Sequence, residues 1–196
     1  MPVSKNPFLK TFFPVWILPA LGLTSCSRLE QLQSDNTPEQ WLASHSHVVV
    51  KTGSFDFVLA EPSSTILVYG LGLVLLWAAW RFSVHKGDSR SVKLWALGLL
   101  VWAISTFSAG TSYQAFSYEI KCAGKNLCSW TSWWEIWYMA LYVLSMGIIA
   151  AAVAFSSLSR NARKPFLIYL LAITFIYEVV LFRGALLPNQ LMVSFE

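Results

Sequence analysis

Residues 131–155 read TSWWEIWYMALYVLSMGIIAAAVAF, an apolar run with a single charge at Glu135. A helix of this length, rising about 1.5 Å per residue, reaches across a hydrocarbon core of about 30 Å. Three further apolar segments surround it in the sequence, at residues 64–81, 94–118 and 166–183. Because four segments cannot close a membrane β-barrel, we expect all four to be helices. The predicted fold is an all-α membrane protein, with a four-helix transmembrane bundle over residues 64–196.

The composition also indicates a membrane protein. Of the 196 residues, 56% are hydrophobic and 12% are charged, whereas soluble domains carry about 25% charged residues. Such a short chain has much surface to solvate, so a soluble core cannot account for this deficit. No basic patch with interleaved aromatic residues suggests a nucleic-acid partner. We therefore expect lipid to be the main solvent of this chain.

Residues 1–25 are predicted to be a signal segment. The apolar run at residues 11–23 is too short to span a bilayer but has the length of a signal core. It ends in Leu23-Thr24-Ser25-Cys26, which resembles a bacterial lipobox. The resemblance implies that Cys26 becomes the lipidated first residue of the mature chain. Ordinary cleavage and an uncleaved helix are the alternatives.

Residues 26–63 form the only long polar stretch, and we expect a small cap on the membrane surface. Thr37 and Pro38 have the pattern of a helix N-cap followed by proline at the first helical position. Two β-rich runs flank residues 51–53, which contain Gly53, and this pattern predicts a hairpin. The segment is too small to hold a core of its own.

Basic residues predict the orientation of the chain. The connection between the first two helices and that between the last two contain Arg81, Lys86, Arg90, Lys93, Arg160, Arg163 and Lys164. Lys and Arg concentrate on the cytoplasmic side of membrane proteins. We therefore expect a multi-pass protein of the bacterial inner membrane, with both ends of the mature chain and the cap outside the cytoplasm.

Cys122 and Cys128 lie in the predicted outer loop, where an oxidising environment favours a disulfide. A metal site or a redox pair is the alternative, but the spacing is neither CxxC nor a zinc pattern. No predicted span contains histidine, which disfavours a b-type haem and an intramembrane zinc hydrolase. The sequence predicts no metal and no cofactor.

Polar side chains gather in the outer half of the predicted bundle. Helix rise places seven candidate ligand-binding residues there: Ser112, Tyr113, Gln114, Glu119, Glu135, Glu178 and Arg183. An ionisable group within a membrane is costly, so Glu178 is the first functional candidate and the residue whose loss we expect to damage function most. The alternative is structural: hydroxyl groups and glycine pack helices, while Arg183 pairs with Glu135 or Glu119.

These residues support three hypotheses for function. The first is a binding or accessory protein that holds an amphiphilic small molecule, a membrane lipid, a partner protein or a second copy of the chain. The second is a metal-free enzyme acting on a lipid or isoprenoid, with Glu135 or Glu178 as general acid–base and Tyr113 or Ser112 assisting. The third is a proton-coupled transporter that relays protons through Glu178. No P-loop or familiar hydrolase motif is present.

Overall fold

The computed structural model describes residues 29, 32–53, 55–85 and 89–187. The predicted signal segment at residues 1–25 and the lipidation at Cys26 lie outside the described residues. The prediction for the C-terminal end also falls outside them.

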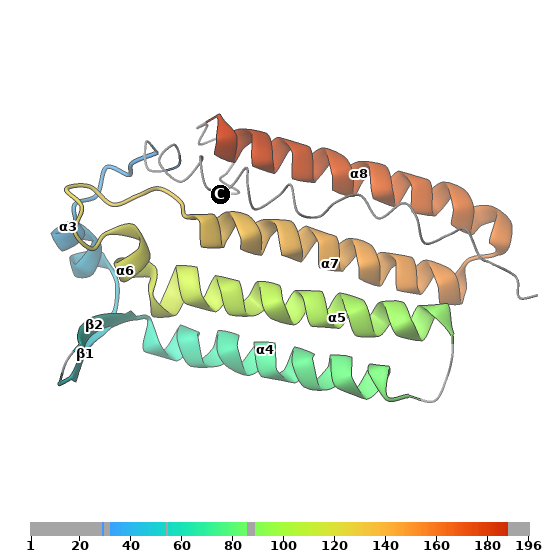
Figure 1. Cartoon of the computed structure of the whole chain (residues 1–196), viewed down its shortest axis with the longest axis horizontal. Helices are drawn as coiled ribbons and strands as arrows, with labels where there is room; N and C mark the ends of the chain where they lie inside the picture. Colours follow the sequence, from blue (N-terminus) through green and yellow to red (C-terminus); the bar gives the residue numbers. More distant parts are fainter. Residues whose placement is uncertain (1–28, 30–31, 54, 86–88, 188–196) are drawn as a thin grey trace, which may run out of the picture.

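Four helices are long and apolar enough to cross a membrane. They are α4 (Pro62–Ser83), α5 (Arg90–Ala109), α7 (Trp133–Ser157) and α8 (Arg160–Leu186), and α5 continues without a break into a π-helical segment. These helices fit a multi-pass membrane protein, as the four apolar segments predict. Figure 1 shows them side by side, in the order α4, α5, α7, α8.

The four helices form an open row. Among the described elements, extensive helix–helix contacts join α4 to α5, α5 to α7 and α7 to α8, so each helix packs mainly on its neighbour in the chain. The row is therefore less closed than the predicted bundle. A lipid solvent permits this arrangement, because apolar side chains that face outward meet acyl chains rather than water.

The fourth helix is longer than its apolar segment predicts. We expected residues 166–183, near the lower limit for a span, whereas α8 runs from Arg160 to Leu186. Pro165 does not end the helix at its own position. It lies in the second turn, where its missing N–H removes a single intrahelical bond and its fixed φ is compatible with a helix.

The second span changes its winding before it ends. Residues Gly110–Ala115 form η2, a π-helix, and the short helix α6 (Ser117–Lys121) follows after Phe116. Hydroxyl groups bond back to carbonyls along this stretch: Thr111 Oγ1 donates to Phe107 O at 2.8 Å, and Ser112 Oγ donates to Ser108 O at 3.0 Å. Both hydroxyl groups are therefore engaged with the backbone of their own helix.

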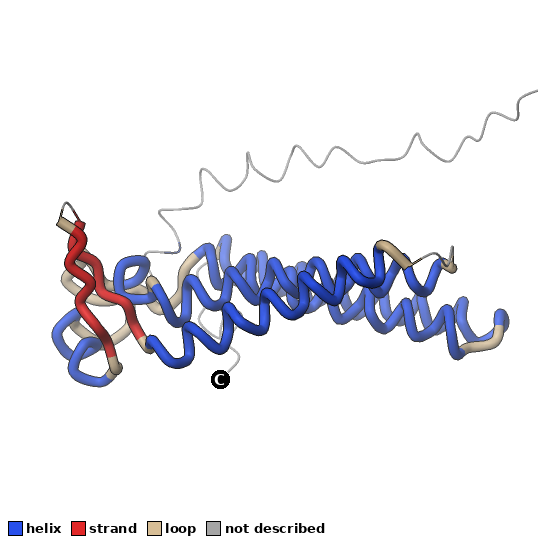
Figure 2. The backbone as a smooth tube through the Cα atoms, turned by 90° about the horizontal axis from the view of Figure 1, so that it is seen from below, coloured by secondary structure: helices blue, strands red, loops and turns tan. Residues whose placement is uncertain are grey.

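One end of the row, which we call the cap end, carries the remaining elements. These are α3 (Pro38–Ser44), the antiparallel strands β1 (His47–Thr52) and β2 (Phe55–Ala60), and α6. Figure 2 shows both strands, in red, at the same end of the helices. A disulfide joins Cys122 and Cys128, with the two sulfur atoms 2.04 Å apart, so the predicted disulfide is confirmed. Both cysteines are buried against Trp41 and Tyr118.

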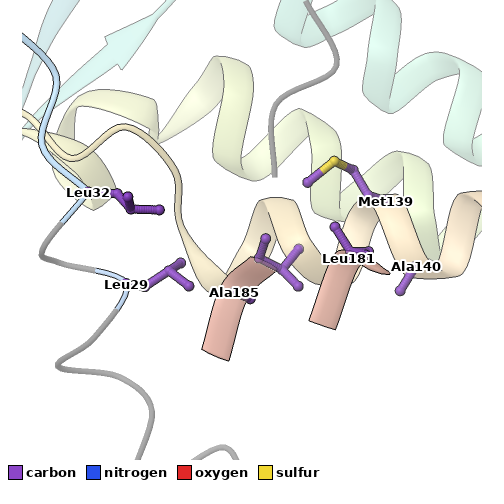
Figure 3. Close-up of a cluster of buried hydrophobic side chains, with 7 residues drawn as sticks. Leu29, Leu32, Met139, Ala140, Leu181 and Ala185 are labelled. Carbon is purple, nitrogen blue, oxygen red and sulfur yellow. The ribbon is translucent and has the colours of Figure 1, made fainter. Parts of the chain in front are cut away.

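Residues 32–36, which we call the strap, run along the disulfide loop. Trp130 N donates to Leu32 O at 2.7 Å, Ser34 N donates to Cys128 O at 2.8 Å, and Cys128 N donates to Asn36 O at 2.9 Å. Leu32 and the preceding Leu29 enter an apolar cluster with α7 and α8, in which Figure 3 shows both leucines directed toward the two helices. The buried partners are Ile136, Met139, Ala140, Leu181 and Ala185.

Candidate functional site

A cavity of about 1020 Å³ lies at the cap end and extends between the helices. All four spanning helices contribute to its lining, together with η2, α6, the disulfide loop and the strap. The polar part of the lining includes Gln114, Lys121, Ser129, Thr131 and Glu135. The apolar and aromatic part, farther from the cap end, includes Val68, Leu71, Trp102, Met139, Tyr142 and Val143. The charged and most of the polar groups therefore lie toward the cap end, which we call the polar end, although Trp41 and Trp130 also line it. The lining between the helices is mostly apolar apart from Thr106, and we call it the apolar end.

Glu135 is the central charged group of the polar end. It lies in the first turn of α7, where Ser132 caps the helix and accepts a hydrogen bond from Glu135 N at 3.4 Å. Its carboxylate is only 2% exposed. Oε2 accepts a hydrogen bond from Thr131 Oγ1 at 2.8 Å, and Oε1 lies 2.5 Å from Lys121 Nζ. The positive end of the helix dipole also favours a carboxylate at this position.

Lys121 reaches Glu135 because the disulfide loop turns the chain back. Lys121 is the last residue of α6, directly before Cys122, and its carbonyl oxygen accepts a hydrogen bond from Ser129 N at 2.9 Å. Its ammonium nitrogen lies 5.1 Å from the centre of the Tyr113 ring, a cation–π contact. The side chain is 15% exposed, so the ion pair is almost fully shielded.

The π-helix supplies the opposite polar wall. Tyr113 and Gln114 both line the cavity from η2, and Tyr113 also makes an edge contact with Tyr138 of α7 at 5.7 Å between ring centres. Gln114 Oε1 is buried and has no hydrogen-bond partner among the described residues. Single π-turns within helices occur frequently at functional sites, because the wider turn redirects the side chains that it carries.

The structure brings together three of the seven predicted site residues. Tyr113, Gln114 and Glu135 line the cavity, whereas the remaining four are not among its lining residues. Ser112 is buried with its hydroxyl bonded to Ser108, and Glu119 Oε1 accepts a hydrogen bond from Val58 N of β2 at 3.0 Å. Glu178 is half-buried in α8, and Arg183 is exposed.

The predicted pairing of Arg183 with Glu135 or Glu119 is wrong. Within the part of the chain that the structure describes, Lys121 is the ion-pair partner of Glu135, and the backbone of β2 binds Glu119. Arg183 lies near the end of α8 and is exposed, although its neighbours Leu181, Gly184 and Ala185 are buried. A helix that packs on only one neighbour does not bring its terminal arginine to the centre of the site.

Sequence reasoning missed Lys121 and Thr131. The signal for Lys121 is its position beside Cys122: the residue before a disulfide loop is fixed in space, and this loop leads directly into the helix that carries Glu135. The signal for Thr131 is its spacing of four residues from Glu135, which suits a side-chain contact across one turn.

Comparison of the chain with known protein families, with curated proteins and with solved structures found no match. Among the described residues, no group of three or more His, Cys, Asp or Glu side chains could hold a metal ion. The function must therefore be argued from the cavity itself.

Proposed function

We propose that this protein binds an amphiphilic small molecule in the cavity, with the polar group of the ligand at the Lys121–Glu135 pair. The observation that carries the proposal is the gradient along the lining, from a buried ion pair to an aromatic and aliphatic wall. Ligand pockets are mostly apolar, with a few convergent polar groups that fix orientation. A membrane lipid is the first candidate ligand, because the helices that line the apolar part are those expected to span the bilayer.

We also propose that the cap end faces away from the cytoplasm, in a bacterial inner membrane. The opposite end of the row carries the basic residues Arg81, Arg90, Lys93, Arg160, Arg163 and Lys164 at the ends of its helices. This distribution agrees with the concentration of Lys and Arg on the cytoplasmic side. The disulfide at the cap end supports the same orientation, since disulfides persist in oxidising compartments.

The enzyme hypothesis uses the same cavity but needs a free base. Both carboxylate oxygens of Glu135 are already engaged, by Thr131 and by Lys121. Ser112 and Glu178, two of its proposed assisting or catalytic groups, are not among the lining residues. These contacts favour binding over acid–base catalysis. The transporter hypothesis depends on Glu178 and gains no support from this lining.

The test is to identify what the cavity holds. Full-length protein is purified in mild detergent, and the bound small molecules are extracted and identified by mass spectrometry. Ala109, a lining residue of α5, is replaced by Trp to fill the cavity, and Leu67→Trp serves as control because Leu67 is 74% exposed on the face of α4. We expect the wild type and Leu67→Trp to carry an amphiphile and Ala109→Trp to lose it. Equal retention by all three proteins would contradict the proposal.

A further inference from the structure

We propose that the cavity selects an amphiphile with an uncharged, hydroxyl-bearing head group, such as a glyceride or a long-chain alcohol, over anionic and cationic amphiphiles. This inference rests on the proposed function and specifies its ligand class. It follows from the charge balance at the polar end of the cavity and from the hydrogen-bonding groups that remain available there.

The charge of the site is already balanced. Lys121 and Glu135 lie in contact, and both are largely shielded from water. An anionic head group would have to share Lys121 with Glu135, so two negative charges would approach each other where screening is weak. A cationic head group would meet Lys121 in the same way. Like charges brought together in a desolvated site cost several kcal/mol, which disfavours both classes of charged ligand.

The neighbouring charges do not change this balance. Lys125 Nζ donates to Ile120 O at 3.2 Å and to Ser129 Oγ at 2.7 Å, and Lys125 itself is not among the lining residues. Glu119, in α6, is also outside the lining, and its carboxylate is bound to β2. Asp35, between the lining residues Ser34 and Asn36, is exposed, and the Nδ1 atom of His45 lies 2.9 Å from Trp41 O. Lys121 and Glu135 are the only Lys, Arg, Asp or Glu side chains among the lining residues, so the formal charges of the lining sum to zero.

The hydrogen-bonding inventory favours a hydroxyl. An ammonium group has three protons. Glu135 and the Tyr113 ring lie beside the Lys121 ammonium, which leaves a proton for a ligand in the cavity that Lys121 lines. On the other wall, the buried Gln114 Oε1 lacks a donor among the described residues. A hydroxyl accepts from Lys121 and donates to Gln114, and it would also satisfy the amide if its oxygen and nitrogen were exchanged. With Gln114 Oε1 in the orientation of the structure, a carbonyl or an ether can accept from Lys121 but has no proton to donate to Gln114.

The apolar end of the cavity suits a hydrocarbon chain. Trp102 of α5, Leu71 of α4 and Val143 of α7 line it, and Leu71 belongs to the exposed surface of its helix. The lining therefore includes an exposed apolar side chain of a spanning helix. A chain that extends from a head group at Lys121 can lie along this wall, and it need not be enclosed at its far end.

The experiment compares three amphiphiles that share one chain length: monodecanoylglycerol, decyl sulfate and decylamine. Full-length protein in lipid nanodiscs is dialysed at neutral pH against each labelled probe, with empty nanodiscs as the blank. We expect the glyceride to bind at least about tenfold more tightly than either charged probe, from the cost of an unbalanced charge. Binding of decyl sulfate or decylamine as tight as that of the glyceride would overturn the inference.

Variants then test the cause of the selectivity. Glu135→Gln leaves Lys121 as an unbalanced positive charge, so the preference should shift to decyl sulfate. The double change Lys121→Gln with Glu135→Gln removes both charges and should keep the preference for the glyceride. Asp56→Asn and Lys51→Gln, on the hairpin and outside the cavity lining, serve as charge-matched controls and should leave the wild-type order. An unchanged order in Glu135→Gln would also overturn the inference.

The proposed function and the inference fail in different ways. If none of the three probes binds above the blank, the proposal of an amphiphile site falls and the inference with it. If a charged probe binds best to the wild type, the amphiphile site stands and only the uncharged head group is rejected.

Discussion

The interface between α5 and α7 and the interface between α7 and α8 differ in how they are held. Cross-helix contacts run along the whole of the first: Ser91 Oγ donates to Ala152 O at 2.8 Å, Ser105 Oγ donates to Tyr138 O at 3.1 Å, and Gly98 packs against Ile149. The buried residues of α8 are Leu181, Gly184 and Ala185, all near the cap end.

We call the α5–α7 pair, which is held along its length, the platform, and α8, which is held mainly near the cap end, the wall. Lys121, Gln114 and Glu135 belong to the elements that continue or begin α5 and α7, so the polar groups of the cavity lie on the tightly packed pair. Tyr177 reaches the cavity from α8, which is anchored mainly at one end. The polar groups of the cavity are therefore positioned by the platform, and the wall contributes Tyr177 to the lining.

The largest loss of stability is expected when the buried leucine that holds α8 in the apolar cluster is removed. Leu181 is fully buried in the cluster with the strap, and Leu181→Ala should destabilise this interface by about 3 kcal/mol through lost burial and a residual cavity. Leu171→Ala, on the same helix at a side chain that is 71% exposed, is the control and should cost little. Hydrogen exchange of α8 in nanodiscs measures both. Equal protection of α8 in the two variants would remove the distinction between platform and wall.

A smaller loss of stability is expected when either of two glutamates is neutralised. Glu135→Gln leaves Lys121 without its partner and should lower the free energy of unfolding by about 2 kcal/mol, less than for a fully buried pair because Lys121 retains some exposure. Glu178→Gln should cost under about 1 kcal/mol, because Glu178 has no ion-pair partner among the described residues. Denaturant titration of both variants in the same detergent compares them. A larger loss for Glu178→Gln than for Glu135→Gln would contradict this ranking.

The smallest effect tests the packing of the platform. A Cβ atom on Gly98 would lie 2.7 Å from Ile149 Cγ1, so Gly98→Ala should destabilise the α5–α7 pair by about 1 kcal/mol, after the gain in helix propensity is subtracted. Gly70→Ala is the matched control, since nothing lies within 4 Å of its added Cβ. Thermal unfolding that ranks Gly70→Ala below Gly98→Ala would contradict the assignment of Gly98 to a close contact.

The four spans and the disulfide could be predicted from the sequence, and so could the position of Glu135 near the N-terminal end of its helix. The partner of Glu135 could not be predicted. We treated residues 94–118 as one helix, whereas the π-turn and the short helix α6 bend the chain so that Lys121 faces α7. The depth of Glu178 could be estimated from helix rise, but its direction could not. The helix α8 carries apolar residues on nearly all of its faces, so its sequence does not indicate which face packs inward.

The strap also has a consequence for the order in which this protein is made. Leu29 and Leu32 are translated well before Leu181 and Ala185, which they pack against. The apolar cluster that they share therefore cannot form until α8 has been synthesised and inserted. A contact between segments so distant in the chain also carries a high closure entropy and forms late in folding. The cavity thus gains Tyr177 only after α8 is in place, and a chain truncated before α8 would lack this part of the lining.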